Sequence, residues 1–204
     1  MDSGSHEGHS PGDHPDGGHG NVDAMAVSAT LHCLTGCAIG EILGLMIGTA
    51  LGFSTIATIA LAVGLAFFFG YTLSTLPLLK AGMALGSALT VVLAADTLSI
   101  ATMEIVDNAV MALIPGAMDA GLVNPVFWLA MMLALTVAFF AAYPVNRYLL
   151  RRGKGHALTH QYHGATGTVT GPRRFIPSLS TGALIAVIVA FMLGGLVVSV
   201  AAGL

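Results

Sequence analysis

Residues 24–52 read AMAVSATLHCLTGCAIGEILGLMIGTALG and form the first long apolar stretch of the chain. About twenty apolar residues in a helix cross the hydrocarbon core of a bilayer, so a span at about 25–52 is long enough. Four further stretches meet the same criterion, at about 54–79, 84–113, 125–150 and 177–203. The sequence therefore predicts an all-α integral membrane protein, a bundle of about five transmembrane helices.

The composition agrees with a membrane protein and argues against a soluble one. Mean hydropathy is +0.86, and charged residues make up 8% of the chain, against about 25% in an average soluble domain. We therefore expect the lipid bilayer to be the main partner of this chain, and we expect no nucleic acid.

Basic residues gather around one predicted loop. Six of the seven flank or occupy the segment between the fourth and fifth spans: Arg147, Arg151, Arg152, Lys154, Arg173 and Arg174. Loops rich in Lys and Arg stay on the cytoplasmic side of a membrane. Alternation of the spans then places the N-terminus in the cytoplasm as well. We expect a multi-pass protein of the bacterial inner membrane.

Two polar segments lie outside the predicted spans. Residues 1–23 are rich in His, Gly and Asp and are expected to form a disordered tail, in front of a polytopic membrane domain at 24–204. Within that domain, residues 151–175 form a basic loop that contains histidines. The span at 54–79 carries no ionisable group except Tyr71, and we expect it to be a lipid-facing scaffold that ends at Pro77.

Three side chains that can bind a metal ion follow one another at four-residue spacing in the first span: Cys33, Cys37 and Glu41. The helical period of about 3.6 residues aligns them along one stripe. Small residues at the same spacing, which let a neighbouring helix approach closely, lie on an overlapping face: Gly36, Gly40, Gly44, Gly48 and Gly52. The stripe is therefore expected to face the interior of the bundle.

The third span is unusual for its acidic residues, Asp96, Glu104 and Asp107. Laid beside the first span, it predicts a polar track that holds, from the inner half outward, Cys33 and Cys37, then Glu41 level with Asp96, then Glu104 and Asp107. Four buried carboxyl groups cannot all be ionised without cations. Either several of them are protonated or a cation is bound.

These residues suggest a transition-metal site, with Cu or Zn as the expected ion. Thiolate favours Cu(I) or Zn(II), while carboxylate with imidazole favours Zn(II), Mn(II) or Fe(II). The predicted ligands are Cys33, Cys37, Glu41, His32, Asp96, Glu104, Asp107 and Met103, together with His156, His160 and His163 of the basic loop. The alternatives are that His32 only bonds a backbone carbonyl or interfacial water and that Met103 belongs to the core.

Several motifs resemble a bacterial family of small polytopic membrane proteins that share a domain of unknown function. They are HCLTGCAIGE at 32–41, MEIVDN at 103–108, PVNR at 144–147 and GKGHA at 153–157. The resemblance covers about residues 25–203 and implies the fold and the membrane location. Members of the family are sometimes labelled copper oxidase, but the chain has no cupredoxin-like His–Cys–Met pattern on a β-rich segment.

Three functions are compatible with this pattern. The first is a small transition-metal transporter or metal-homeostasis protein with a Cys/Glu/Asp-lined path, in which the cytoplasmic histidines collect metal. The second is a non-catalytic accessory protein whose polar and Gly-rich helix faces assemble with a partner or with a second copy. The third is a haem- or thiol-dependent redox protein, although no CxxCH motif is present. No catalytic residue is predicted, and a homodimer is expected because five spans are few for a self-contained transporter.

Overall fold

The computed structural model describes residues 17–152, 175–176 and 180–203. These residues contain five helices: α1 (Gly17–Leu51), α2 (Thr55–Lys80), α3 (Leu85–Leu113), α4 (Pro125–Arg151) and α6 (Thr181–Ala202). Each helix is long and apolar enough to cross a membrane, and this part of the chain holds no strand. The predicted fold class, an all-α bundle of membrane-spanning helices, is confirmed.

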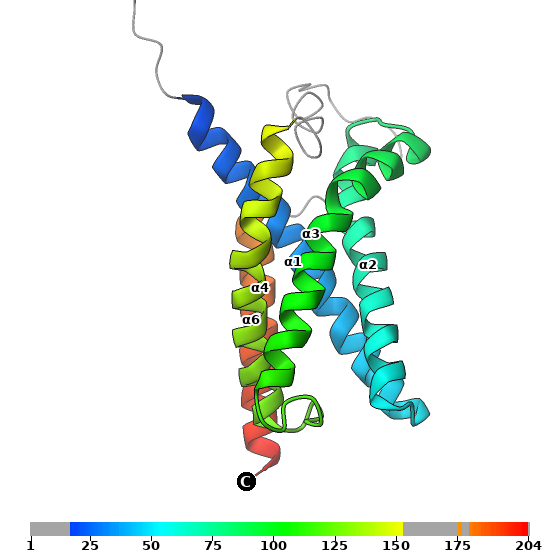
Figure 1. Cartoon of the computed structure of the whole chain (residues 1–204), viewed down its shortest axis with the longest axis vertical. Helices are drawn as coiled ribbons and strands as arrows, with labels where there is room; N and C mark the ends of the chain where they lie inside the picture. Colours follow the sequence, from blue (N-terminus) through cyan, green and yellow to red (C-terminus); the bar gives the residue numbers. More distant parts are fainter. Residues whose placement is uncertain (1–16, 153–174, 177–179, 204) are drawn as a thin grey trace, which may run out of the picture.

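The first helix lies at the centre of the bundle. It crosses the other helices obliquely (Figure 1) and contacts each of the other four that the structure describes. Half of its membrane-spanning window is buried inside the protein, a larger share than for any of the others. In Figure 1, α1, α3 and α6 run in one direction while α2 and α4 run in the other. The central position explains why α1 can carry polar side chains that lipid would not tolerate.

The glycines of α1 are covered by α2. A Cβ atom added at Gly40 would overlap the backbone of Ala66, and one added at Gly44 would overlap Ala62. The same close approach pairs Gly36 with Gly70 and Gly48 with Thr58. The two antiparallel helices therefore meet along matched small residues at four-residue spacing, the arrangement that brings membrane helices closest together. The expectation that α2 is a lipid-facing scaffold is incomplete, because one face of α2 is the partner of this glycine stripe.

On the other side of α1, small residues of α4 allow a second close contact. The buried face of α4 carries alanines at four-residue spacing: Ala130, Ala134, Ala138 and Ala142. At the end of this helix near the α3–α4 loop, Trp128 lies against α6, where a Cβ at Gly195 would overlap the indole ring. The indole nitrogen of Trp128 donates a hydrogen bond to the Leu122 carbonyl (2.7 Å), which holds the loop between α3 and α4 against the bundle.

Sharp turns join the first four helices. Gly52 has a φ of +68°, a conformation that favours glycine, and it permits the short turn from α1 to α2 that the sequence predicts. Asn124 caps α4 by accepting a hydrogen bond from the Val126 amide (2.9 Å), and Pro125 occupies the first turn, where the missing N–H costs nothing. The ends of α1 and α3 and the starts of α2 and α4 therefore lie at one end of the bundle (Figure 1).

Two helix boundaries differ from the predicted spans. Helix α1 begins at Gly17, so residues 17–23, which the composition assigns to the tail, are helical. Asp23 in this extension pairs with Arg147 on α4, an interaction that the local sequence does not reveal. Helix α2 continues past Pro77 to Lys80, so this proline, which removes one i→i−4 hydrogen bond, does not end the helix as predicted.

The start of the last helix is defined by a serine. Ser180 caps α6 by accepting a hydrogen bond from the Ala183 amide (3.2 Å), and the helix begins at Thr181. The predicted start at residue 177 falls on residues 177–179, which lie outside the described part of the chain.

Replacement of Gly40 by Ala is expected to destabilise the protein. The added methyl group would overlap the backbone of Ala66, and overpacking of this kind costs about 1–3 kcal/mol. Gly64→Ala on α2 is the matched control, since nothing lies within 4 Å of its Cβ position. Thermal unfolding in detergent should show a lower midpoint for Gly40→Ala and an unchanged or higher midpoint for Gly64→Ala. Equal midpoints would contradict the close α1–α2 contact.

Candidate intramembrane thiol and carboxyl site

The acidic residues of the third span all face the interior. Asp96, Glu104 and Asp107 of α3 are 2–4% exposed, and they recur along the face that packs on α1 and α4 together with Ser99 and Met103. The spacing of eight and three residues between the three acidic residues keeps them on one side of the helix. The facing stripe on α1 is equally buried, with Cys33 at 0%, Cys37 at 2% and Glu41 at 8% exposure.

Where α1 meets α3, the thiol and carboxyl groups form three successive contacts. The Cys33 thiol interacts with Asp96 at one level, and the Cys37 thiol interacts with Glu104 at the next. At the third level, Glu41 interacts with Asp107 and lies near Glu104 as well. The structure thus brings together all six of the Cys, Glu and Asp residues that the sequence predicts within the spans.

The register of these contacts differs from the predicted track. The sequence places Asp96 level with Glu41, whereas the structure sets Asp96 beside Cys33 and Asp107 beside Glu41. The spacing along each helix is fixed by the sequence, but the offset between two helices depends on how they cross. Here the oblique course of α1 shifts the whole acidic face of α3 relative to the stripe on α1 (Figure 1).

Several carboxylate oxygens at this interface have no hydrogen-bond partner among the described residues. The buried oxygens without a partner are Oε1 and Oε2 of Glu41, Oε1 and Oε2 of Glu104, and Oδ1 of Asp107. A carboxylate withdrawn from water without a partner costs several kcal/mol. A bound cation, or a proton on one of each pair, would remove this cost.

The serines around Cys33 were not singled out by the sequence. Ser99 of α3 and Ser74 of α2 interact with the Cys33 thiol, and both are almost fully buried. Ser99 lies three residues after Asp96 and therefore on the same face, which is a signal that the sequence does contain. Nothing in the sequence of α2 marks Ser74, because its role depends on where α2 crosses α1.

Two further predicted ligands lie close to this stripe. The ring of His32 is oriented by a hydrogen bond from Nδ1 to the Ser28 carbonyl (2.8 Å); since a carbonyl only accepts, Nδ1 carries the proton. This bond matches the alternative in which His32 bonds a backbone carbonyl. Met103 is buried in the same apolar cluster as Cys33 and Cys37. The other predicted ligands, His156, His160 and His163, lie outside the described residues.

The part of the chain that the structure describes contains no preformed metal site. No three His, Cys, Asp or Glu side chains within it are arranged to hold one ion. The thiols and carboxyl groups come in pairs rather than in a closed tetrahedral set. The geometry therefore resembles a row of incomplete sites more than a structural metal centre, which surrounds its ion with four protein ligands.

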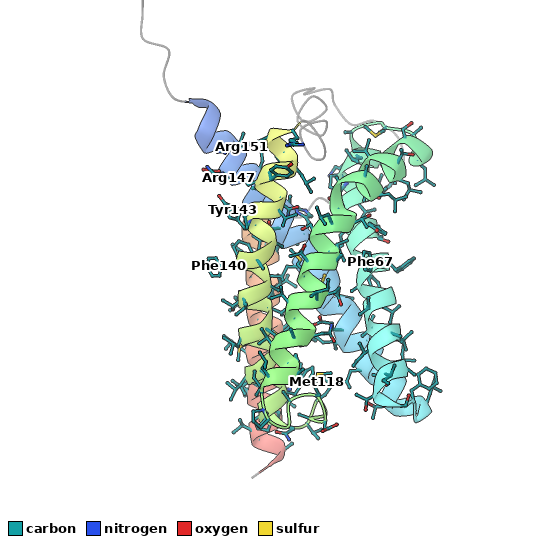
Figure 2. The ribbon with its side chains drawn as sticks, viewed as in Figure 1. Phe67, Met118, Phe140, Tyr143, Arg147 and Arg151 are labelled. Carbon is teal, nitrogen blue, oxygen red and sulfur yellow. The ribbon has the colours of Figure 1, made fainter. Side chains whose placement is uncertain are left out.

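A cavity of about 310 Å³ leads to one end of this row. Glu41, Asp107 and Asn108 line it on the inside, and Phe53, Thr55 and Asp119 lie at its exposed rim. Met118, labelled in Figure 2, also lines it and marks its place at the lower end of the bundle. The carboxyl pair of Glu41 and Asp107 is therefore the part of the site nearest to the outside.

Polar contacts between α1 and α4 close the opposite end. The Arg147 guanidinium pairs with Asp23, with Nε 2.6 Å from Oδ1 and Nη2 3.3 Å from Oδ2. Next to Arg147 on α4, the Asn146 amide donates a hydrogen bond to Thr30 Oγ1 of α1 (2.8 Å) in a buried setting. We call these two contacts the α1–α4 clamp. Figure 2 shows Arg147 near the upper end of α4, away from Met118. No local pattern in the sequence marks Asp23 and Thr30 as the partners of Arg147 and Asn146.

Five apolar helices around a buried thiol and carboxyl site define a multi-pass membrane protein. The chain belongs to the family described as "Domain of unknown function (DUF4396)", which matches residues 24–155. This segment contains the whole site, the cavity and the α1–α4 clamp except Asp23, and it ends before α6. No curated protein and no solved structure matches the chain.

Replacement of Glu41 by Gln is expected to stabilise the fold. The amide keeps the shape of the side chain and removes a buried charge whose oxygens have no partner. Each kcal/mol gained raises the unfolding midpoint of a chain of this size by about 2–4 °C.

Thr30→Val is the contrasting variant in the same measurement. It leaves the buried Asn146 amide without its acceptor, so it should lower stability by about 1–3 kcal/mol. If Glu41→Gln lowers the midpoint as much as Thr30→Val does, the carboxyl group is a structural element rather than a functional one.

Proposed function

We propose that this protein is a small transition-metal transporter or metal-homeostasis protein of the Cu/Zn class in the bacterial inner membrane. The observation that carries the proposal is the Glu41 carboxyl group. It is 92% buried, given its exposure of 8%, neither of its oxygens has a hydrogen-bond partner among the described residues, and it faces Asp107 across the α1–α3 interface. A membrane helix rarely retains such a group unless the group acts on an ion, a proton or a substrate.

The charge balance around Glu41 favours a cation. Glu41, Glu104 and Asp107 interact with one another, and Cys37 adds a thiol beside Glu104. A divalent ion at this point would neutralise two negative charges and supply ligand bonds to oxygens that lack hydrogen bonds. When it leaves, protons can take its place, so the same groups could exchange metal for protons.

The paired arrangement suits an ion that moves rather than one that stays. An ion is conducted only if each site binds it well enough to attract it and weakly enough to release it. Successive pairs of ligands, Glu41 with Asp107, Cys37 with Glu104 and Cys33 with Asp96, offer such partial sites along the α1–α3 interface. Water or the next pair would complete the coordination at each step.

The direction of insertion belongs to the same proposal. The six basic residues around the segment after α4 favour a cytoplasmic position for the end of the bundle that holds the α1–α4 clamp. The cavity end would then face the periplasm.

The alternative of an accessory protein that assembles through its glycine-rich face receives less support. That face of α1 is covered by α2 within the chain, at Gly70, Ala66, Ala62 and Thr58. Assembly of a homodimer through other surfaces remains a separate prediction. The third alternative, a haem-dependent redox protein, requires a haem absorption band in the spectrum of the purified chain.

Elemental analysis of the purified full-length protein tests the proposal. The wild type should retain Zn or Cu after gel filtration, and Cys37→Ser, Glu41→Gln and Asp107→Asn should each bind it at least tenfold more weakly, because even a supporting residue costs about 10–100-fold. Glu7→Gln makes the same chemical change as Glu41→Gln outside the spans and should retain the metal. Folded variants that hold metal as the wild type does, or a wild type without metal, would overturn the proposal.

A further inference from the structure

The cavity beside Glu41 has an exposed rim and a buried floor. Its rim is formed by the α1–α2 turn, with Phe53 and Thr55, and by the α3–α4 loop, with Asp119. At its floor are the Glu41 and Asp107 side chains, which are 8% and 4% exposed. The Glu41 carboxylate is therefore a buried group without a hydrogen-bond partner that lines a space open to the outside.

The size of the cavity matches an ion that still carries its water. Each water occupies about 30 Å³ in the liquid, so an ion with six waters needs roughly 180 Å³. The cavity volume of about 310 Å³ accommodates this ion with room for movement. A fully dehydrated ion would be far too small to fill it.

The polar groups around the cavity are oxygen ligands. Besides the three carboxyl groups of Glu41, Asp107 and Asp119, they comprise the Asn108 amide and the hydroxyl groups of Thr49, Thr55 and Thr58. Oxygen ligands suit hydrated divalent ions, and the two groups at the floor, Glu41 and Asp107, present oxygen. The thioethers of Met111, Met118 and Met131 also line the cavity and are ligands of the kind that Cu(I) prefers. The thiols of Cys33 and Cys37 are buried beyond the floor, and they do not line the cavity.

At the far end of the site, contacts between side chains join α1 to α4. The Asp23–Arg147 ion pair and the Thr30–Asn146 hydrogen bond join α1 to α4 there. Between them and the thiols, Ala26, Thr30 and Cys33 are 0% exposed. Glu41 itself lines the cavity, so an ion that enters the cavity meets this carboxyl group directly.

We propose that this cavity is the entrance through which a hydrated divalent cation, such as Zn(II), reaches Glu41 and Asp107, with Asp119 attracting it at the rim. The inference rests on the proposed function and narrows its substrate from a transition-metal ion to a hydrated divalent one. Asp119 is a positioning residue here, because it acts before the ion meets the buried pair. Access is one-sided as long as the α1–α4 clamp is closed.

Thiol labelling tests the entrance without any transport. Thr58→Cys places a thiol on the cavity wall. The native Cys33 and Cys37 are buried, so labelling of the wild type measures the background reaction. Thr102→Cys is the matched control: this threonine of α3 bonds the Leu98 carbonyl and does not line the cavity. Val123→Cys in the exposed α3–α4 loop and Arg151→Cys at the end of α4 identify the two sides of the membrane.

We expect membrane-impermeant methanethiosulfonates to label Thr58→Cys only from the side that labels Val123→Cys. A trimethylammonium reagent should react about tenfold faster than its sulfonate counterpart, because the acidic cavity concentrates cations. Added Zn²⁺ should slow the reaction at Thr58→Cys and leave Val123→Cys unchanged.

Three results would overturn the inference. Labelling of Thr58→Cys at the rate of Thr102→Cys would show that the cavity is not open, and labelling from the Arg151→Cys side would reverse its direction. If added Zn²⁺ does not slow the labelling of Thr58→Cys, the inference that the cavity binds a divalent cation is contradicted. By contrast, charge-selective, Zn²⁺-protected labelling in a protein that transports no metal would leave the entrance intact and overturn only the proposed transport.

Asp119→Asn tests the role at the rim. In proteoliposomes at low ionic strength we expect KM for Zn²⁺ uptake to rise about three- to tenfold with unchanged kcat, since a steering charge changes the rate of encounter. The effect should disappear at high salt, and Asp119→Glu should restore the wild-type KM. An unchanged KM, or a loss of kcat instead, would exclude steering by Asp119.

Discussion

The close contact between α1 and α2 is the constraint on which the rest of this structure depends. Matched small residues, Gly36 with Gly70 and Gly40 with Ala66, bring the two backbones together along most of their length. This contact protects one side of α1 from lipid, and α3, α4 and α6 contact other parts of the helix. Because lipid tails provide no hydrophobic drive between helices, such close packing is the main source of association inside a membrane. Only a helix enclosed in this way can carry thiols and a carboxyl group at mid-span.

Buried polar residues in the described part of the chain differ in how their atoms are paired. In the α1–α4 clamp, polar groups on the two helices contact each other directly, Asn146 with Thr30 and Arg147 with Asp23. Glu41 and Glu104 instead have oxygens without hydrogen bonds. The contrast separates two kinds of buried polar residue, one that fastens helices and one whose energetic cost is offset only by a ligand or a proton. The proposed function depends on residues of the second kind, Glu41 and Glu104.

The segment that matches the family, residues 24–155, coincides with α1–α4 and contains the six thiol and carboxyl residues of the site. Helix α6 lies beyond it and contributes none of these residues, although Gly195 receives the Trp128 ring. Three of the four motifs that resembled the family lie on the stripe of α1, on the acidic face of α3 and on the α4 side of the α1–α4 clamp. The fourth, at 153–157, lies outside the described residues. The proposed entrance lies at the other end of the same four helices, so site, clamp and cavity form one continuous feature.

The sequence by itself determined the class of fold, the spans to within a few residues and the faces that carry the chemistry. Apolar length specifies a membrane helix, and helical periodicity specifies which side chains share a face. Only the tertiary structure decided the offset between helices, and with it the pairing of Asp96 with Cys33 and of Asp107 with Glu41. It also revealed Ser74, the Asp23–Arg147 pair and the cavity. These features join residues far apart in the chain, and their positions follow from crossing angles and close packing, which no local pattern encodes.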